Sequence, residues 1–184
     1  MEPFCRDKLR EQAWRRFQRY VRKEIKRTPV RGAETQWCRD VFYIEKLNAI
    51  VEWCESKGID VVMAKKANGV YDPGDATITI TCRASPEKQL HYLLHECGHH
   101  LIGMKEHHER FGKGYPQGNN PKVMNTFEHK LACLEEEIEA WHRGWKLSRR
   151  LRLNVDREQF DATRIECLKT YVEWTSKKRK RKSK

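Results

Sequence analysis

Apolar residues recur at helical spacing over several long stretches of the chain, and these stretches predict helices. The first covers residues 4–27 and the second covers 35–57, and each is followed by a glycine or proline that favours a break. Two further helices are expected over residues 128–152 and 157–175. Residues 104–127 hold three Gly and two Pro without a regular period, so we expect an irregular segment there.

Two short strands are expected between the second helix and the middle of the chain. The stretch "ATITITCR", residues 76–83, alternates strictly, with Ile78 and Ile80 on one side and threonines on the other. One buried and one polar face is typical of an antiparallel or edge strand. The apolar run "IDVVMAK", residues 59–65, is the other strand, and the turn-rich "ANGVYDPGD" separates the two.

A buried helix is expected directly after the alternating strand. Ser85 is a favoured N-cap and Pro86 a favoured first helical residue, and leucines at helical spacing continue the apolar face to near Gly103. We therefore predict an α+β fold in which a small antiparallel or mixed sheet packs on this helix, with additional N- and C-terminal helices. The predicted parts are a basic helix over residues 1–32, a globular domain over 33–175 and a disordered basic tail over 176–184.

Positive charge is concentrated at the two ends of the chain. The formal net charge is +12, of which residues 1–32 contribute +7 and residues 176–184 another +7, so the remainder carries −2. Such ends favour nucleic acid or another anionic surface, because neutralised phosphates release counterions. A solubilising tail explains the same charge run equally well. The tail segment "KKRKRK" also resembles a nuclear localisation signal.

The cysteine pattern bears on the compartment. Seven cysteines are scattered along the chain and no C-x-x-C pair occurs, which argues against a disulfide framework and against a zinc ribbon. Reduced thiols in a cytosol-like compartment are expected. The charged N-terminus does not fit a secretory signal, and no run of about 18 apolar residues fits a membrane span. We expect a cytoplasmic protein without a membrane partner, located in the host cytoplasm if viral, or in the nucleus if the tail acts as a signal in a eukaryotic cell.

The stretch "HYLLHECGHH" contains the spacing H-E-x-x-H at His95, Glu96 and His99. Residues four apart on a helix point the same way, so both imidazoles can bind one ion. Glu96 projects to the side, near the position where a water ligand would sit, and is placed to accept its proton. Zinc lowers the pKa of its bound water to about 7. We therefore expect one zinc ion, with His95 and His99 as ligands and Glu96 as the catalytic base.

A third ligand is expected on the helix over residues 128–152. Glu137 lies at the centre of a short face of apolar or small residues formed by Cys133, Leu134, Ala140, Trp141 and Gly144. An unpaired buried carboxylate is costly, so Glu137 needs a cation, either zinc or Lys130 two turns away. Glu136 is the third ligand if the helical phase is off by one. His107 and His108, in the segment after the first motif, are further candidates for the third ligand.

These residues resemble a known group. His-Glu-Cys-Gly-His at residues 95–99 resembles the H-E-x-G-H of ImmA/IrrE-type metallopeptidases, which belong to the glutamate zincins. The second motif of that group has Glu, then Ala three residues later, then a further small residue, and Glu137, Ala140 and Gly144 match this order. The strand-then-helix entry is also similar, and the resemblance extends to small phage and viral proteins of metallopeptidase type. The resemblance covers about residues 58–150 of the chain.

Two departures distinguish this chain from that pattern. Arg143-Gly144 replaces the aromatic-small ending, and the segment between the motifs is longer and rich in histidine. That segment is similar to SprT-like proteases, whose third ligand is a His with an aromatic residue four positions on, as in His107 and Phe111.

The resemblance implies a zinc-dependent metallopeptidase that hydrolyses peptide bonds of a protein or peptide substrate. It implies that Glu96 also donates a proton to the leaving amine, and that the edge strand Thr77–Thr81 takes up an extended peptide by strand addition. An oxyanion partner is expected among Tyr71, Tyr115 and His142. The alternatives are a non-catalytic, zinc-stabilised nucleic-acid-binding protein and a zinc hydrolase acting on other amides.

Overall fold

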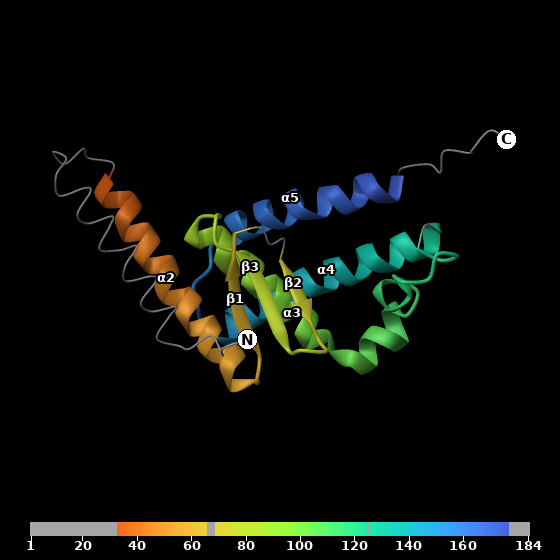
Figure 1. Cartoon of the computed structure of the whole chain (residues 1–184). Helices are drawn as coiled ribbons and strands as arrows, with labels where there is room; N and C mark the ends of the chain where they lie inside the picture. The colour runs from red at the N-terminus through yellow and green to blue at the C-terminus, as the bar shows by residue number, and fades with distance from the viewer. Residues whose placement is uncertain (1–32, 66–68, 125, 177–184) are drawn as a thin grey trace. The chain divides into compact units, whose positions relative to one another are not determined.

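The computed structural model describes residues 33–65, 69–124 and 126–176 of the chain. The basic helix expected over residues 1–32 lies outside these ranges, as does all of the expected tail after Ser176, so both stay predictions. The described residues have a mixed α+β structure of four α-helices and a small three-stranded sheet (Figure 1). The chain divides into two compact units, with the boundary between Leu93 and Leu94, and each unit is described by itself.

The first unit contains one helix, the sheet and the start of a second helix: α2 (Ala33–Ser56), β1 (Asp60–Ala64), β2 (Val70–Asp72), β3 (Thr77–Thr81) and the first turns of α3 (Pro86–Phe111). Gly58 follows α2 with a φ of 71°, in the left-handed region that favours glycine. This conformation lets the N–H of Ile59 donate to the carbonyl of Cys54, which ends the helix and leads into β1.

The sheet has the strand order β1-β3-β2, so β3 is its central strand. It pairs in parallel with β1 and antiparallel with β2. The alternation expected for β3 is confirmed, because Ile78 and Ile80 are fully buried while the threonines are half-buried. The expectation that Thr77–Thr81 is an edge strand that takes up a peptide is wrong. Residues 70–72, whose turn-rich surroundings concealed a strand, pair with one side of β3, and β1 pairs with the other.

The core of the first unit draws apolar side chains from α2, β1, β3 and the start of α3. Its fully or almost fully buried members are Ile50, Cys54, Ile59, Val61, Ile78, Ile80, Leu90 and Leu93. Burying a side chain of this size contributes roughly 1.5–3 kcal/mol, so this cluster stabilises the unit that carries the first turns of α3. The Tyr43 hydroxyl also donates a hydrogen bond to the Glu87 carboxylate and so connects α2 with α3.

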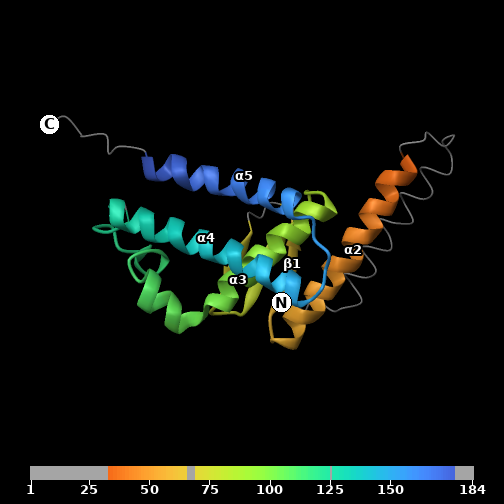
Figure 2. The same cartoon turned by 180° about the vertical axis from the view of Figure 1, so that it is seen from behind.

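The second unit is helical and consists of the remainder of α3, the short 3-10 helix η1 (Tyr115–Gln117), α4 (Phe127–Arg150) and α5 (Arg157–Ser176). Helices α4 and α5 lie side by side in both views (Figures 1 and 2). Thr126 caps α4 because its hydroxyl accepts a hydrogen bond from the N–H of His129 at 3.2 Å. Within the described ranges, no helix has the length and apolar composition that a membrane crossing requires.

Helix α3 is longer than expected and is bent. Gly103 interrupts it with φ 72° and ψ 154°, and the helix resumes and runs to Phe111. The irregular segment expected over residues 104–127 is therefore wrong for its first eight residues. Few residues of this stretch are apolar, so no helical period was visible in the sequence. Phe111 stabilises the far end of the helix, because it is fully buried and belongs to one core cluster with Ile102 and Ala140.

Glycines let α3 and α4 approach until their backbones are in contact. A Cβ atom on Gly98 would lie 1.9 Å from the carbonyl oxygen of Ala140, and one on Gly144 would lie 2.4 Å from that of Leu94. Neither position therefore accepts a larger residue without moving a helix. This close approach brings the middle of α4 against the turns of α3 that follow Leu94.

Candidate metal centre

Helix α3 presents two imidazoles in the same direction. The Ser85 hydroxyl accepts a hydrogen bond from the N–H of Lys88 at 3.3 Å, which supports the predicted start of the helix. His95 and His99 are four residues apart, so their side chains lie on one face. Their ring centroids are 4.8 Å apart, and the exposed fractions of the side chains are only 10% and 14%.

Helix α4 places Glu137 against both of these imidazoles. Its Oε2 lies 3.1 Å from Nε2 of His95, and its Oε1 lies 3.4 Å from Nε2 of His99. One ligand atom from each of the three residues lies within 4.8 Å of the others, so the group could hold a metal ion. Two imidazole nitrogens and a carboxylate oxygen are donors that zinc accepts, and the residues therefore fit the expected metal.

The charges around the centre call for a cation. Glu96, Glu136 and Glu137 are all at least 96% buried by exposed area. Burial opposes the protonation of His99, but the hydrogen bonds that its ring donates to the carboxylates of Glu136 and Glu137 outweigh this effect and raise the pKa of His99 to about 10. Burial likewise opposes the ionisation of Glu137, but the imidazoles of His95 and His99 outweigh it and hold the pKa of Glu137 well below its usual value. Without a metal, a proton on His99 supplies the positive charge that these carboxylates require.

Glu136 lies on the opposite edge of the His99 ring. Its Oε1 is 3.4 Å from Nδ1 of His99 and 2.9 Å from Nδ1 of His107. Carboxylates in this place hold the second ring nitrogen of a metal-ligating histidine and so fix the orientation of the ring. Of the two histidine candidates for the third ligand, His107 thus contacts Glu136. His108 is exposed, and its ring centroid lies 5.5 Å from that of His107. Of the candidates for the third ligand, Glu137 is the one that lies beside both imidazoles of the motif in the described part of the chain.

The His95 ring is held by stacking. It lies against the indole of Trp141 with 4.4 Å between ring centroids and 24° between planes. Nδ1 of His95 is buried and has no hydrogen-bond partner among the described residues. The stack with Trp141, which is itself 1% exposed, is thus the contact that sets the plane of this ring.

Two phenols extend the centre, and one of them was missed in the sequence. The Tyr115 hydroxyl donates to Oε1 of Glu137 and is also hydrogen-bonded to the Tyr171 hydroxyl at 2.9 Å. Burial, and after it the charge of Glu137, raises the pKa of both phenols well above the usual value, so both stay protonated. In the sequence, Tyr171 is one of the apolar residues at helical spacing on α5. Nothing around it indicates that its hydroxyl takes part in a site.

Glu96 is 4% exposed and lies beside the centre. Its charge adds to the effects of Glu136 and Glu137 on the pKa of His99, and after burial and Glu137 it also raises the pKa of Tyr171. These two effects place the Glu96 carboxylate within electrostatic range of an imidazole and a phenol of the centre.

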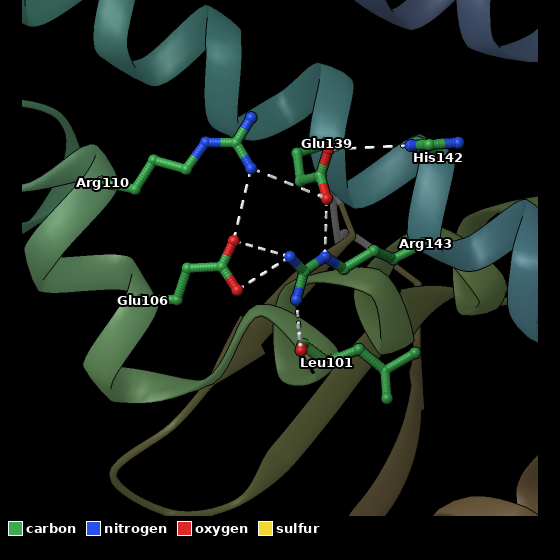
Figure 3. Close-up of polar contacts among 6 residues, drawn as sticks. All are labelled: Leu101, Glu106, Arg110, Glu139, His142 and Arg143. Atoms are coloured by element: carbon green, nitrogen blue, oxygen red, sulfur yellow. Dashed lines mark hydrogen bonds and ion pairs between the residues drawn. The ribbon is translucent and has the colours of Figure 1, made fainter.

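The three oxyanion candidates differ in their places. Tyr115 lies at the centre, as its bond to Glu137 shows. Tyr71 belongs to β2 in the first unit. The His142 side chain is 53% exposed, and its Nδ1 lies 3.7 Å from the carboxylate of Glu139 in a surface cluster (Figure 3).

The fold and the site together define a mixed α+β protein with a candidate metal centre built from two helices. No family model, no curated protein and no solved structure matches this chain. The resemblance to zincin metallopeptidases therefore stays a prediction, and the function is argued from the geometry of the centre.

Proposed function

We propose that this chain is a zinc-dependent metallopeptidase with a zincin-like core, in which His95, His99 and Glu137 hold one zinc ion. The observation that carries the proposal is the convergence of these three donors within 4.8 Å. Glu96, which follows His95 in the chain, is also buried. Three protein ligands leave a coordination position for water or substrate, as in catalytic zinc sites. Structural zinc usually has four protein ligands, commonly cysteine, and Cys97 is not in the group found among the described residues. The donor set therefore favours catalysis over the non-catalytic alternative.

Glu96 serves as the general base and acid of the reaction. Zinc in such a site polarises a bound carbonyl group and lowers the pKa of water to about 7. Glu96 accepts a proton from the attacking water and returns it to the leaving amine, which accelerates such steps roughly 10²- to 10⁴-fold. Its near-complete burial keeps the carboxylate away from bulk water, where its proton would be exchanged with solvent.

Tyr115 stabilises the negative charge that develops on the carbonyl oxygen. Because burial and Glu137 raise the pKa of Tyr115, its hydroxyl is a hydrogen-bond donor throughout the physiological range. Its single proton is donated to Glu137 in this structure, and in the proposed reaction it turns to the carbonyl oxygen, where a donor at developing charge is among the strongest contributions. Tyr171, hydrogen-bonded to Tyr115, holds this phenol in place.

The test is the exchange of Glu96 for glutamine, which keeps the shape of the side chain and removes the proton acceptor. We expect the zinc-loaded full chain to hydrolyse an unfolded protein such as casein, and Glu96→Gln to lose about 100-fold or more of this rate while it still binds zinc. Glu135→Gln, which changes an exposed acid on α4, is the control and keeps full activity. Cleavage by Glu96→Gln at the wild-type rate contradicts the proposal, and zinc binding without any hydrolysis favours the structural alternative.

A further inference from the structure

A single carboxylate oxygen is shared between a histidine of the metal centre and a histidine of the bent part of α3. Oε1 of Glu136 faces Nδ1 of His99 at 3.4 Å and Nδ1 of His107 at 2.9 Å. We propose that His107 is a positioning residue for the metal centre, because it holds the Glu136 carboxylate that orients the ring of His99 toward Glu137. The inference rests on the proposed function and deepens it, since it assigns the arrangement that holds one zinc ligand.

Glu136 depends on these donors because it is buried. Its side chain is 3% exposed, and its second oxygen, Oε2, has no hydrogen-bond partner among the described residues. A buried carboxylate without donors is costly and turns toward solvent when space permits. The bond from His107 is the shorter of the two that Oε1 receives, and removing it leaves Glu136 less firmly placed against His99.

His107 reaches Glu136 only because α3 is bent. In a straight helix the Cα atoms of His99 and His107, eight residues apart, would be separated by about 12 Å along the axis. The two rings could not then share one oxygen of a third side chain. The non-helical backbone of Gly103, with a φ of 72°, redirects the last turns of the helix and brings His107 to Glu136.

Arg143 of α4 holds this bend from both sides. Its guanidinium donates to the carbonyl oxygen of Leu101 at 2.7 Å, before the break, and to both oxygens of Glu106 at 2.6 and 2.8 Å, after it (Figure 3). The planar fork of arginine makes these bonds at once, which a lysine cannot do. Because Glu106 immediately precedes His107, the clamp on one residue sets the place of the next.

The neighbouring His108 offers a matched control. It is an exposed imidazole on the same turn, and its ring is 5.5 Å from that of His107. If the segment merely contributed positive charge or bulk, the two histidines would be interchangeable. If His107 acts through Glu136, only its replacement disturbs the binding of metal.

The experiment measures the zinc affinity of the metal-stripped full chain by competition with a chromophoric chelator. We expect His107→Ala to bind zinc about 10-fold more weakly than wild type, the lower end of the range for such outer contacts. We expect His108→Ala to stay within about 2-fold of wild type, well below that range. His107→Asn, whose amide nitrogen replaces Nδ1, recovers most of the affinity. The visible spectrum of the cobalt-loaded protein reports the ligand geometry and changes in His107→Ala but not in His108→Ala.

Equal zinc affinities of His107→Ala and His108→Ala, with unchanged cobalt spectra, overturn the inference. A wild-type chain that binds no zinc instead contradicts the metal centre itself, so the two failures are distinguishable. If His107→Ala does not fold, His107→Asn is compared with His107→Gln, whose amide nitrogen is one bond farther from the backbone. The inference then predicts tighter zinc binding by His107→Asn, and equal binding contradicts it.

Discussion

At the scale of single residues, His95 and His99 face the same carboxylate, yet each ring is held in a different way. His99 lies between Glu137 on one ring nitrogen and Glu136 on the other. His95 is bonded on one side only, and its ring lies against Trp141. The orientation of one ligand thus depends on hydrogen bonds, and that of the other on aromatic packing.

This difference predicts a specific effect of Trp141→Ala. Removal of a fully buried indole lowers the free energy of unfolding of the metal-free chain by about 3–5 kcal/mol, and the freed His95 ring weakens zinc binding as well. Trp141→Phe keeps a stacking ring and retains most of the zinc affinity. Denaturant unfolding and chelator competition measure the two quantities.

Trp145→Ala is the control for this substitution. Trp145 lies on α4, as Trp141 does, and both indoles pack on Phe160 of α5, with ring centroids 5.4 Å and 5.3 Å away. We expect Trp145→Ala to lower the free energy of unfolding without the loss of zinc affinity. An unchanged zinc affinity in Trp141→Ala would show that the stack does not hold His95.

The sequence was informative about residues that a motif or a helical face marks, and uninformative about the rest. A helical wheel placed Glu137 at the centre of a short apolar face with Ala140 and Trp141, and the structure buries all three. The contacts of Tyr171 and His107 could not be predicted, because nothing in the sequence around either residue indicates its partner. The Tyr115–Tyr171 bond spans 56 positions and the His107–Glu136 bond 29, and both depend on how the helices cross.

At the scale of elements, the backbone contact between α3 and α4 is what brings the ligands together. We predict that Gly98→Ala separates these helices, because its new Cβ would lie 1.9 Å from a backbone oxygen that cannot move aside. Overpacking of this kind costs about 1–3 kcal/mol of stability or more. The ligands on the two helices then move apart, so zinc affinity falls as well.

Gly74→Ala is the matched control, since its Cβ would meet only the side chain of Asp72, at 3.2 Å, which can turn away. Thermal unfolding and zinc competition compare the two variants. A Gly98→Ala chain with wild-type stability and zinc affinity would contradict the tight crossing.

The bend of α3 predicts a pH-dependent stability. A hydrogen bond and ion pair with Arg143 hold the pKa of Glu106 below its usual value. The stabilisation is therefore present above the pKa of the unfolded chain, about 4.3, and is lost as the pH falls through the lower folded-state pKa. We expect Glu106→Gln to be less stable than wild type at pH 7 and the difference to shrink below about pH 4.

Denaturant unfolding of the metal-free chain at the two pH values measures this effect. Glu109→Gln is the control, because that side chain is 67% exposed and its only described ion pair, with Lys105, is 3.8 Å long. A stability difference for Glu106→Gln that is the same at pH 7 and below pH 4 would argue against the clamp.

Element types were predictable where apolar residues recur at helical spacing, as for α2, α4 and α5, or alternate, as for β3. Two elements were missed for physical reasons. The strand β2 is three residues long and lies among turn residues, so it forms only through its pairing with β3. The last turns of α3 are mostly charged, and they are helical because Arg143 and the burial of Phe111 hold them there.

At the scale of the whole molecule, every proposed ligand belongs to one of the two compact units. His95, His99 and Glu137 all lie after Leu93, so the second unit contains the complete centre. The mixed α+β class follows from the alternation and the helical stripes, and was predictable for that reason. The family stays a prediction, because the resemblance rests on two short motifs and no family model matches the chain.

The most direct test of the central claim is the zinc content of the purified full chain after dialysis, measured by mass spectrometry. The account predicts about one zinc ion per wild-type chain and about one per Glu135→Gln chain, in which only an exposed acid is changed. It predicts little or no zinc in Glu137→Gln, which loses the carboxylate that lies against both imidazoles. Zinc retained at the wild-type level by Glu137→Gln, or absent from all three proteins, would contradict the account.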